Sequence, residues 1–422
     1  MNDFESSPIP ATQAAPAGED SPYAVLRHRD FLLYLVARFI ASLGQQMLTV
    51  AVGWELYERT RSTLALGLVG LTQMVPMVLF TLPAGHLADN RNRKQLILAA
   101  TLVILVSSIS LTLVSILQAP VFCMYACLFL AGTGRTFLWP ASSAFLPQLV
   151  SRKLFPRAVT WNTGSFHLSS VAGPAAGGAV IALTHRAAAV YAINAVAILI
   201  CFALICLVRS RHFAPVREKL SPTTLIAGFR FVFANRIILG TITLDLFAVL
   251  LGGATALLPA YAKDILHVGP SGLGFLQAAL PVGSLVSALV LAHRPPLEKA
   301  GRALLLAVAT FGVATIAFGI SNSFLFSLLA LAVCGATDNV SVVVRHTLVQ
   351  LLTPDEKRGR VSAGISLFIG TSIELGGFES GLVAYWVGPV LSVVLGGIGT
   401  LLAVGAVALL WPEIRRYGRL DS

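Results

Sequence analysis

Long apolar runs dominate this sequence of 422 residues and restrict the folds that it can adopt. Charged residues make up only 12% of the chain, whereas soluble domains carry about 25%. A helix needs about 20 mostly apolar residues to cross a bilayer, and an open strand edge would leave backbone groups unpaired there. Runs of this length lie near 31–57, 64–86, 95–117, 121–148, 158–184, 187–208, 237–262, 272–293, 302–320, 324–350, 361–386 and 389–411. We therefore predict an all-α membrane protein with twelve transmembrane helices.

The formal net charge of +11 is distributed in a way that indicates membrane topology and not binding to nucleic acid. With the N-terminus in the cytoplasm, 23 of the 30 Lys and Arg residues fall in cytoplasmic segments. Only Arg59, Arg61, Arg186 and Lys263 fall on the opposite side. Because cytoplasmic loops are enriched in Lys and Arg, we expect a multi-pass protein of the cell (inner) membrane with both termini in the cytoplasm.

A short internal repeat divides the chain into two halves. Residues 148–151 read QLVS and residues 350–353 read QLLT, each at the end of the fourth predicted helix of a six-helix set. Parallel repeats of this kind build many transporters. The predicted parts are a disordered cytoplasmic tail at 1–24, an N-terminal six-helix half at 25–208, a linker at 209–236, a C-terminal six-helix half at 237–411 and a cytoplasmic tail at 412–422.

The predicted linker contains a candidate amphipathic helix. Ser221 and Pro222 are typical of a helix start, and apolar residues then recur at helical spacing among several cations. This pattern favours a helix lying on the cytoplasmic leaflet. The alternative is that these residues begin the seventh transmembrane span.

A basic turn separates the second and third apolar runs. Residues 82–96 read LPAGHLADNRNRKQL, so that Gly85 and Asp89 are followed closely by Arg93 and Lys94. The order Gly-x-Leu-Ala-Asp followed by cations resembles the loop between helices 2 and 3 of the major facilitator superfamily. That resemblance implies a fold of two pseudo-symmetric six-helix halves. It also implies that Asp89 latches the halves on the cytoplasmic side, assisted by the nearby cations.

Further segments resemble the enterobactin exporter and multidrug efflux branch of this superfamily, whose members are proton antiporters. They lie between about Leu26 and Trp411 and read ARFIASLG at 37–44, GPAAGG at 173–178, AGFRFV at 227–232 and GFLQAALPVG at 274–283, with a further turn at Arg358–Arg360. GPAAGG is similar to the fifth-helix signature of antiporters. Gly173, Gly177 and Gly178 would let another helix approach closely, and Pro174 would bend the helix.

Charged residues within the apolar runs are the candidates for coupling to protons, because a charge at the bilayer centre is costly. Burial without a partner favours the neutral form of a carboxyl group. Asp245 ranks first because no cation shares its helix face, and Asp338 shares its own face with Arg345. Glu374 ranks third, followed by Glu379. The alternative is that these charges serve as contacts between helices.

Polar residues at helical spacing indicate a cavity shared by several helices. The stripes are Arg38, Ser42, Gln45 and Thr49; Thr160, Thr163, His167, Ser170 and Pro174; Gln277, Pro281 and Ser284; and Asp338, Ser341 and Arg345. Together with Arg135, these give as cavity candidates Arg38, Gln45, Arg135, His167, Gln277 and Arg345. A hydrogen-bonded packing role is the alternative for His167. A cavity that also held Trp139 and Phe247 would suit many amphipathic molecules.

These features predict a secondary active transporter that exports a small amphipathic molecule, drug-like or siderophore-like, by proton antiport and alternating access. The expected partners are this substrate, protons and the lipid bilayer. The sequence contains no Gly-x-x-x-x-Gly-Lys loop for ATP and no metal-ligand spacing among its five cysteines, so we predict neither cofactor nor metal. An uptake carrier, a lysophospholipid transporter and a transport-incompetent sensor remain as alternatives. An enzyme is disfavoured because no nucleophile–base cluster is evident.

Overall fold

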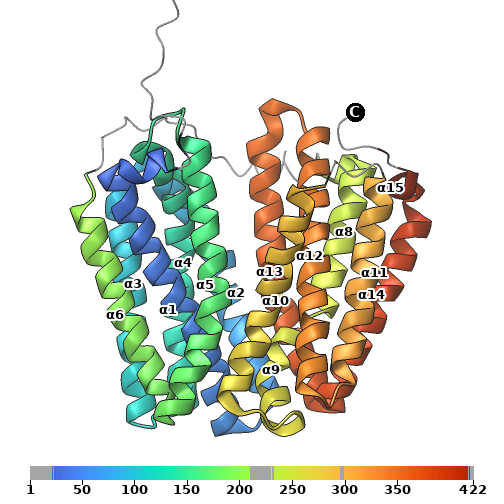
Figure 1. Ribbon diagram of the computed structural model, residues 1–422, viewed down its shortest axis with the longest axis horizontal. Coiled ribbons are helices and arrows are strands. Elements are labelled where there is room, and N and C mark those ends of the chain that lie inside the picture. The colour runs from blue at the N-terminus through green and yellow to red at the C-terminus, as the bar shows by residue number, and fades with distance from the viewer. Residues whose placement is uncertain are drawn as a thin grey trace, which may run out of the picture.

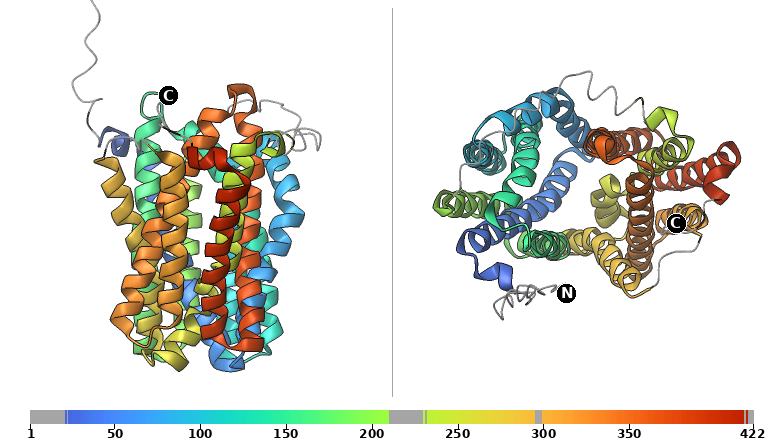
Figure 2. Two further views of the ribbon diagram at one scale, coloured as in Figure 1. Left: turned by 90° about the vertical axis from the view of Figure 1, so that its right-hand side faces the viewer. Right: turned by 90° about the horizontal axis from the view of Figure 1, so that it is seen from above.

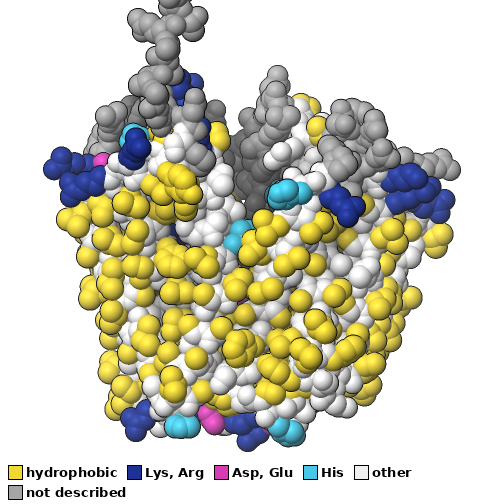
Figure 3. Space-filling view, in the orientation of Figure 1, with side chains coloured by type: hydrophobic (Ala, Val, Ile, Leu, Met, Phe, Trp, Pro, Cys, Tyr) yellow, Lys and Arg dark blue, Asp and Glu magenta, His cyan; other side chains and the backbone are white. Residues whose placement is uncertain are grey.

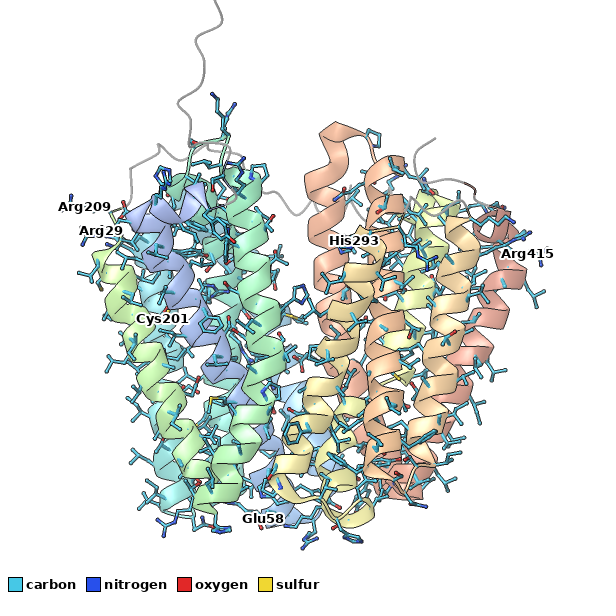
Figure 4. The ribbon with its side chains drawn as sticks, in the orientation of Figure 1. Arg29, Glu58, Cys201, Arg209, His293 and Arg415 are labelled. Carbon is cyan, nitrogen blue, oxygen red and sulfur yellow. The ribbon has the colours of Figure 1, made fainter. Side chains whose placement is uncertain are left out.

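The computed structural model of the protein describes residues 21, 23–209, 230, 232–294, 299–416 and 418. These residues form helices and connecting segments, and no strand occurs among them. The helices build two bundles that lie side by side (Figure 1). Arg29 and Arg415 lie at one end of the molecule, here called the terminal end, and Glu58 lies at the other, here called the far end (Figure 4).

The first bundle contains six long helices joined by short turns. They are α1 (Arg29–Thr60), α2 (Thr63–Asn90), α3 (Arg93–Ile116), α4 (Val121–Leu149), α5 (Phe155–Thr184) and α6 (Ala187–Leu207), preceded by the short helix η1 (Ala24–Arg27). Two of the far-end turns are tight because Arg61 and His185 adopt left-handed conformations directly after α1 and α5. Such C-terminal residues end a helix abruptly and let the chain reverse.

The second bundle is similar, but its first span is interrupted. Its elements are α8 (Arg236–Leu251), η2 (Ala254–Leu257), α9 (Leu258–Ala260), η3 (Tyr261–Ile265), α10 (Gly269–Ala292), α11 (Ala300–Gly319), α12 (Phe324–Leu352), α13 (Asp355–Val387), α14 (Pro389–Leu410) and α15 (Pro412–Arg416). The expectation of an unbroken helix over 237–262 is therefore wrong. The α-helix stops at Gly252 and Gly253, which favour irregular backbone, and Pro259 lacks the N–H that a regular helix needs.

The architecture confirms the predicted all-α membrane fold. Eleven helical segments of the described chain are long and apolar enough to cross a membrane, with Arg236–Ile265 counted as one of them. The remaining predicted span, 361–386, corresponds to α13, which packs against α2, α8 and α14. Apolar side chains cover the flank of the molecule, and Lys and Arg gather near its two ends (Figure 3).

Seen from above, the helices again form two groups (Figure 2). The space-filling view shows the bundles packed together at the far end and hollowed between them at the terminal end (Figure 3). One apolar cluster spans both bundles, and it includes the fully buried Leu56 of α1, Leu257 of η2 and Leu273 of α10. Burying such side chains stabilises the contact by about 25 cal/mol per Å² of apolar surface. The far-end half of the interface is thus closed in this conformation.

Two seams lined by glycine bring the bundles into backbone contact. Between α5 and α10, a Cβ atom at Gly178 would overlap the carbonyl oxygen of Pro270 and lie 3.1 Å from Cα of Gly274. Between α2 and α13, a Cβ atom at Gly67 would lie 2.9 Å from the carbonyl oxygen of Phe378. Glycine permits this separation because it has no side chain to keep the helices apart.

Most of the predicted N-terminal tail and linker lies outside the described residues. This applies to residues 1–20 of the tail and to 210–229, which hold most of the expected amphipathic helix. The segment predicted as the C-terminal tail begins with helix α15. Ile414 of α15 is fully buried, and Glu413 forms an ion pair of 2.9 Å with Arg236 of α8. Both contacts tie this segment to the second bundle.

Candidate functional site

A cavity of about 580 Å³ lies between the two bundles. Helices α1, α2, α4 and α5 contribute to it from the first bundle, and η2, α9, α10 and α13 contribute from the second. Much of its wall is apolar. Its polar side chains are Gln45, Gln46, Thr49, Gln73, Arg135, Ser170, Thr255, Gln277, Ser284 and Glu374. A mostly apolar pocket with a few placed polar groups is typical of a site for a small organic molecule.

Arg135 of α4 enters the cavity beside Gln73 of α2. Close packing of these two helices positions the pair, since a Cβ atom at Gly132 would lie 2.9 Å from the Pro76 ring. Arg135 Nη2 donates a hydrogen bond to Oε1 of Gln73. Of the described residues that line the cavity, Arg135 is the single cation.

Glu374 of α13 is the single carboxylate among the same lining residues. The α2–α13 seam places it, because a Cβ atom at Gly70 would overlap the backbone carbonyl oxygen of Glu374. Gln73 follows Gly70 by about one helical turn, so the seam also brings the Gln73–Arg135 pair near the carboxylate. Glu374 and Arg135 are within range of each other's charge. The two opposite charges therefore come from different bundles.

The predicted site residues divide between this cavity and other places. Gln45, Arg135, Gln277 and Glu374 line it, as do Thr49, Ser170, Pro174, Pro281 and Ser284 of the predicted stripes. Arg38, His167, Arg345, Asp245, Asp338, Glu379, Trp139 and Phe247 are not among its lining residues. Gln46 and Gln73 were missed because only charged intramembrane groups were weighed one by one. The available signals were the position of Gln46 beside Gln45 and the isolated amide of Gln73 in an apolar run.

Asp245 has a partner, contrary to expectation. Asp245 of α8 and Arg345 of α12 form a buried ion pair inside the second bundle. The prediction that no cation compensates Asp245 is therefore wrong, because it considered only the face of its own helix. The ion pair also engages the cation that was expected to act on Asp338. Within the part of the chain that the structure describes, Arg345 Nε has no hydrogen-bond partner.

The other predicted charges lie in separate surroundings. Asp338 of α12 is partly buried, and the adjacent Asn339 donates a hydrogen bond of 2.9 Å to Ser287 of α10. Glu379 of α13 accepts a hydrogen bond of 3.4 Å from Ser380. The His167 ring of α5 lies 6.2 Å from the Phe166 ring, and Arg38 of α1 lies near the Cys201 side chain of α6.

Polar and charged residues at the far end contact each other across the two bundles. We call this group, made of Tyr57, Glu58, Arg61, Lys263 and Asp264, the far-end clasp. Tyr57 donates a hydrogen bond to Asp264, and Arg61 pairs with Asp264 at 2.8 Å. Lys263 pairs with Glu58 at 3.2 Å, and its Nζ lies 5.1 Å from the centre of the Trp54 ring. In the sequence, Arg61 and Lys263 indicated only the orientation of the chain. The acidic residues Glu58 and Asp264 lie close to them in the sequence and could have indicated this contact.

The basic turn between α2 and α3 makes contacts within the first bundle. Asp89 lies in the last turn of α2 and not in a loop, and Asn92 caps α3 by accepting a hydrogen bond from the backbone of Lys94. Lys94 Nζ donates to the carbonyl oxygens of Cys206 and Val208, at the end of α6. Cations at a helix C-terminus satisfy its free carbonyl groups. Arg93 donates to the carbonyl oxygen of Ala144 on α4. Whether Gly85 and Asp89 act as a latch stays a prediction.

The GPAAGG segment of α5 faces two different partners. Gly173 and Gly177 pack on α1, where a Cβ atom at Gly177 would lie 2.8 Å from the carbonyl oxygen of Met47. Gly178 packs across the interface on α10, and Pro174 lines the cavity. The segment thus combines a contact inside one bundle with a contact between the bundles.

No group of three or more His, Cys, Asp or Glu side chains that could hold a metal ion occurs among the described residues. All five cysteines are free thiols. The site is therefore described by its mostly apolar cavity and by the opposite charges of Arg135 and Glu374.

Solved structures of several transporters share this fold of two helical bundles. A POT family transporter in complex with a thioalcohol-conjugated peptide has a TM-score of 0.73 at 13% identity, over 92% of this chain and 96% of that one. The nucleoside transporter NupG has a TM-score of 0.72 at 12% identity, over 90% and 100% of the two chains. A bacterial homologue of the human lysosomal transporter Spinster has a TM-score of 0.71 at 14% identity, over 92% and 98%.

The family is shown by the sequence itself. The transmembrane secretion effector family matches residues 20–421, so the chain belongs to this family of major facilitators. It is 27% identical over 395 residues to the enterobactin exporter EntS of Escherichia coli O1:K1, covering 92% of this chain and 94% of the relative. The enterobactin exporter EntS of Shigella boydii serotype 18 matches to the same extent. The protein is a multi-pass membrane transporter.

Proposed function

We propose that this transporter exports a small amphipathic, siderophore-like molecule from the cytoplasm by proton antiport and alternating access. The observation that carries the proposal is the cavity between the bundles, which Arg135 lines from one half and Glu374 from the other. Its relatives are exporters of enterobactin, which supports the proposed direction and class of substrate.

The distribution of charge supports an orientation in the inner membrane. Lys and Arg residues concentrate in segments at the terminal end, which the positive-inside rule places in the cytoplasm together with both termini. The hollow between the bundles opens toward that end, and the far-end clasp holds the other end closed. In this orientation the described conformation is the one that takes up substrate from the cytoplasm.

Glu374 replaces Asp245 as the leading candidate for proton coupling. Asp245 is buried against Arg345 within one bundle and does not line the cavity between the bundles. Glu374 lines the cavity between the bundles, so its access to water changes when the bundles rock. Asp338 and Glu379 rank behind it because neither lines this cavity.

Transport by inverted membrane vesicles tests the proposal. A panel of amphipathic compounds, including siderophores, is offered to vesicles with and without an acidic interior. We expect accumulation of at least one compound that requires the protein and collapses when a protonophore removes the pH gradient. Accumulation that is independent of the gradient would contradict antiport, and accumulation only in right-side-out vesicles would indicate uptake.

A further inference from the structure

The two charges of the cavity leave binding capacity free for a ligand. Arg135 uses one of the five N–H donors of its guanidinium group in its hydrogen bond to Gln73. Glu374 has no hydrogen bond or ion pair with any of the described residues. Both groups line the same cavity without forming an ion pair, so their remaining donors and acceptors are available to a molecule bound there.

The surroundings of these charges define the rest of the molecule that would fit. Apolar side chains from both bundles, among them Leu66, Val69 and Ile373, line the same cavity. The other polar lining groups are neutral amides and hydroxyls, which accept many partners and impose no net charge. A ligand therefore needs an apolar body and a compact polar head.

We propose that the substrate head carries an acceptor oxygen beside a hydrogen-bond donor and bridges Arg135 and Glu374. The oxygen, preferably anionic, accepts hydrogen bonds from the Arg135 guanidinium. The donor, an ammonium or hydroxyl group, binds the Glu374 carboxylate. This inference rests on the proposed function, because it names the substrate class of the same cavity. Gln73 acts as a positioning residue that aims the guanidinium.

With such a head, a proton and the substrate compete for the Glu374 carboxylate. When a proton from the aqueous phase binds the Glu374 carboxylate, the acceptor for the substrate donor becomes a neutral acid and the ionic part of the interaction is lost. Among the described lining residues, contributed by both bundles, Arg135 is the other charged group, and none is a Tyr, His or Cys. Competition at this cavity thus centres on a single carboxylate.

Three fluorescent probes with the same apolar body test the head group. Nε-dansyl-lysine carries a carboxylate and an ammonium group side by side, dansylcadaverine carries only the ammonium, and ε-dansylaminohexanoate carries only the carboxylate. Their binding is measured by fluorescence titration of the purified full-length protein in lipid nanodiscs. We expect Nε-dansyl-lysine to bind at least about tenfold more tightly than either single-group probe.

Variants assign the two contacts. Arg135→Gln should remove the advantage of Nε-dansyl-lysine over dansylcadaverine, and Glu374→Gln should remove its advantage over ε-dansylaminohexanoate. Lowering the pH from about 8 to about 6 should weaken binding to the wild type and leave Glu374→Gln unaffected. Glu379→Gln is the matched control, since it removes a carboxylate from the same helix outside the cavity lining.

Equal affinities for the three probes, or absence of saturable binding by Nε-dansyl-lysine, would overturn the proposal. If Arg135→Gln loses all binding, its melting temperature shows whether the variant is folded. A folded variant that loses only the preference for the carboxylate supports the assignment. The two proposals fail separately. If Nε-dansyl-lysine binds more tightly than the single-group probes but no transport depends on a pH gradient, antiport is contradicted. If efflux depends on the gradient but the three probes bind equally, only the proposed head group is contradicted.

Discussion

Asp245 of α8 and Arg345 of α12 form an ion pair inside the second bundle, with side chains only 8% and 4% exposed. Both charges are removed from water, so each depends on the other for compensation. This relationship changes the role expected of Asp245 from a carrier of protons to a contact that holds α8 against α12. It also leads to the first prediction.

Neutralising Asp245 alone should destabilise the protein. Asp245→Asn leaves the Arg345 guanidinium buried without its counter-charge, which costs about 3–5 kcal/mol. The double variant Asp245→Asn with Arg345→Met should regain much of this loss, because no unpaired charge remains. Thermal unfolding in detergent measures both effects, with Asp338→Asn as the control. If Asp245→Asn were fully stable but lost only gradient-driven accumulation, Asp245 would be the coupling residue after all.

Neutralising Glu374 should separate exchange from accumulation. Glu374→Gln cannot gain or lose a proton, so we expect substrate counterflow to persist while accumulation driven by a pH gradient falls at least tenfold. Inverted vesicles report both quantities in the same preparation. Glu379→Gln should retain gradient-driven accumulation, since its side chain is not part of the cavity wall. Unchanged accumulation by Glu374→Gln would move the proton site elsewhere.

The glycines of α5 should give two distinguishable defects. Gly178→Ala inserts a methyl group into the seam with α10 and should open the far end, whereas Gly177→Ala pushes α5 from α1 and should lower the melting temperature. Gly164→Ala is a matched control on the same helix, because nothing lies within 4 Å of its added Cβ atom. Transport rates and labelling of a cavity cysteine by impermeant reagents distinguish the cases. Wild-type behaviour of Gly178→Ala would remove the seam from the mechanism.

The far-end clasp should set how readily the far end opens. Asp264→Asn removes the charge that Arg61 binds, so a cysteine placed at Thr49 should be labelled faster from the outside of intact cells. High external salt should act in the same direction on the wild type, because exposed ion pairs are screened. Arg186→Gln alters another far-end cation and serves as the control. Equal labelling of Asp264→Asn and the wild type would show that the clasp does not limit opening.

The sequence predicted the helices well because membrane spans are encoded locally. The repeated QLVS and QLLT segments coincide with the ends of α4 at Leu149 and α12 at Leu352, as proposed. The partner of Asp245 could not be read in the same way, since it depends on which helices become neighbours. Likewise, adjacent glycines at 177 and 178 look equivalent in sequence, and only the packing assigns one to α1 and the other to α10.

The site was predicted in part for the same reason. Gln45 and Gln277 were found because each belongs to a polar stripe, and Glu374 because it is charged. Gln73 was missed because it is neutral and has no polar neighbour at helical spacing. The break after Leu251 had a visible signal in Gly252, Gly253 and Pro259, but hydropathy alone does not register it.

The Arg61–Asp264 ion pair of the far-end clasp is exposed to water, and this limits how long it can delay opening. The two side chains are 59% and 41% exposed, so the pair contributes only about 0–1 kcal/mol. An ion pair that weak lengthens the waiting time for separation by less than about tenfold at 25 °C. Most of the resistance to opening must therefore come from the buried apolar contacts that join the bundles at the far end.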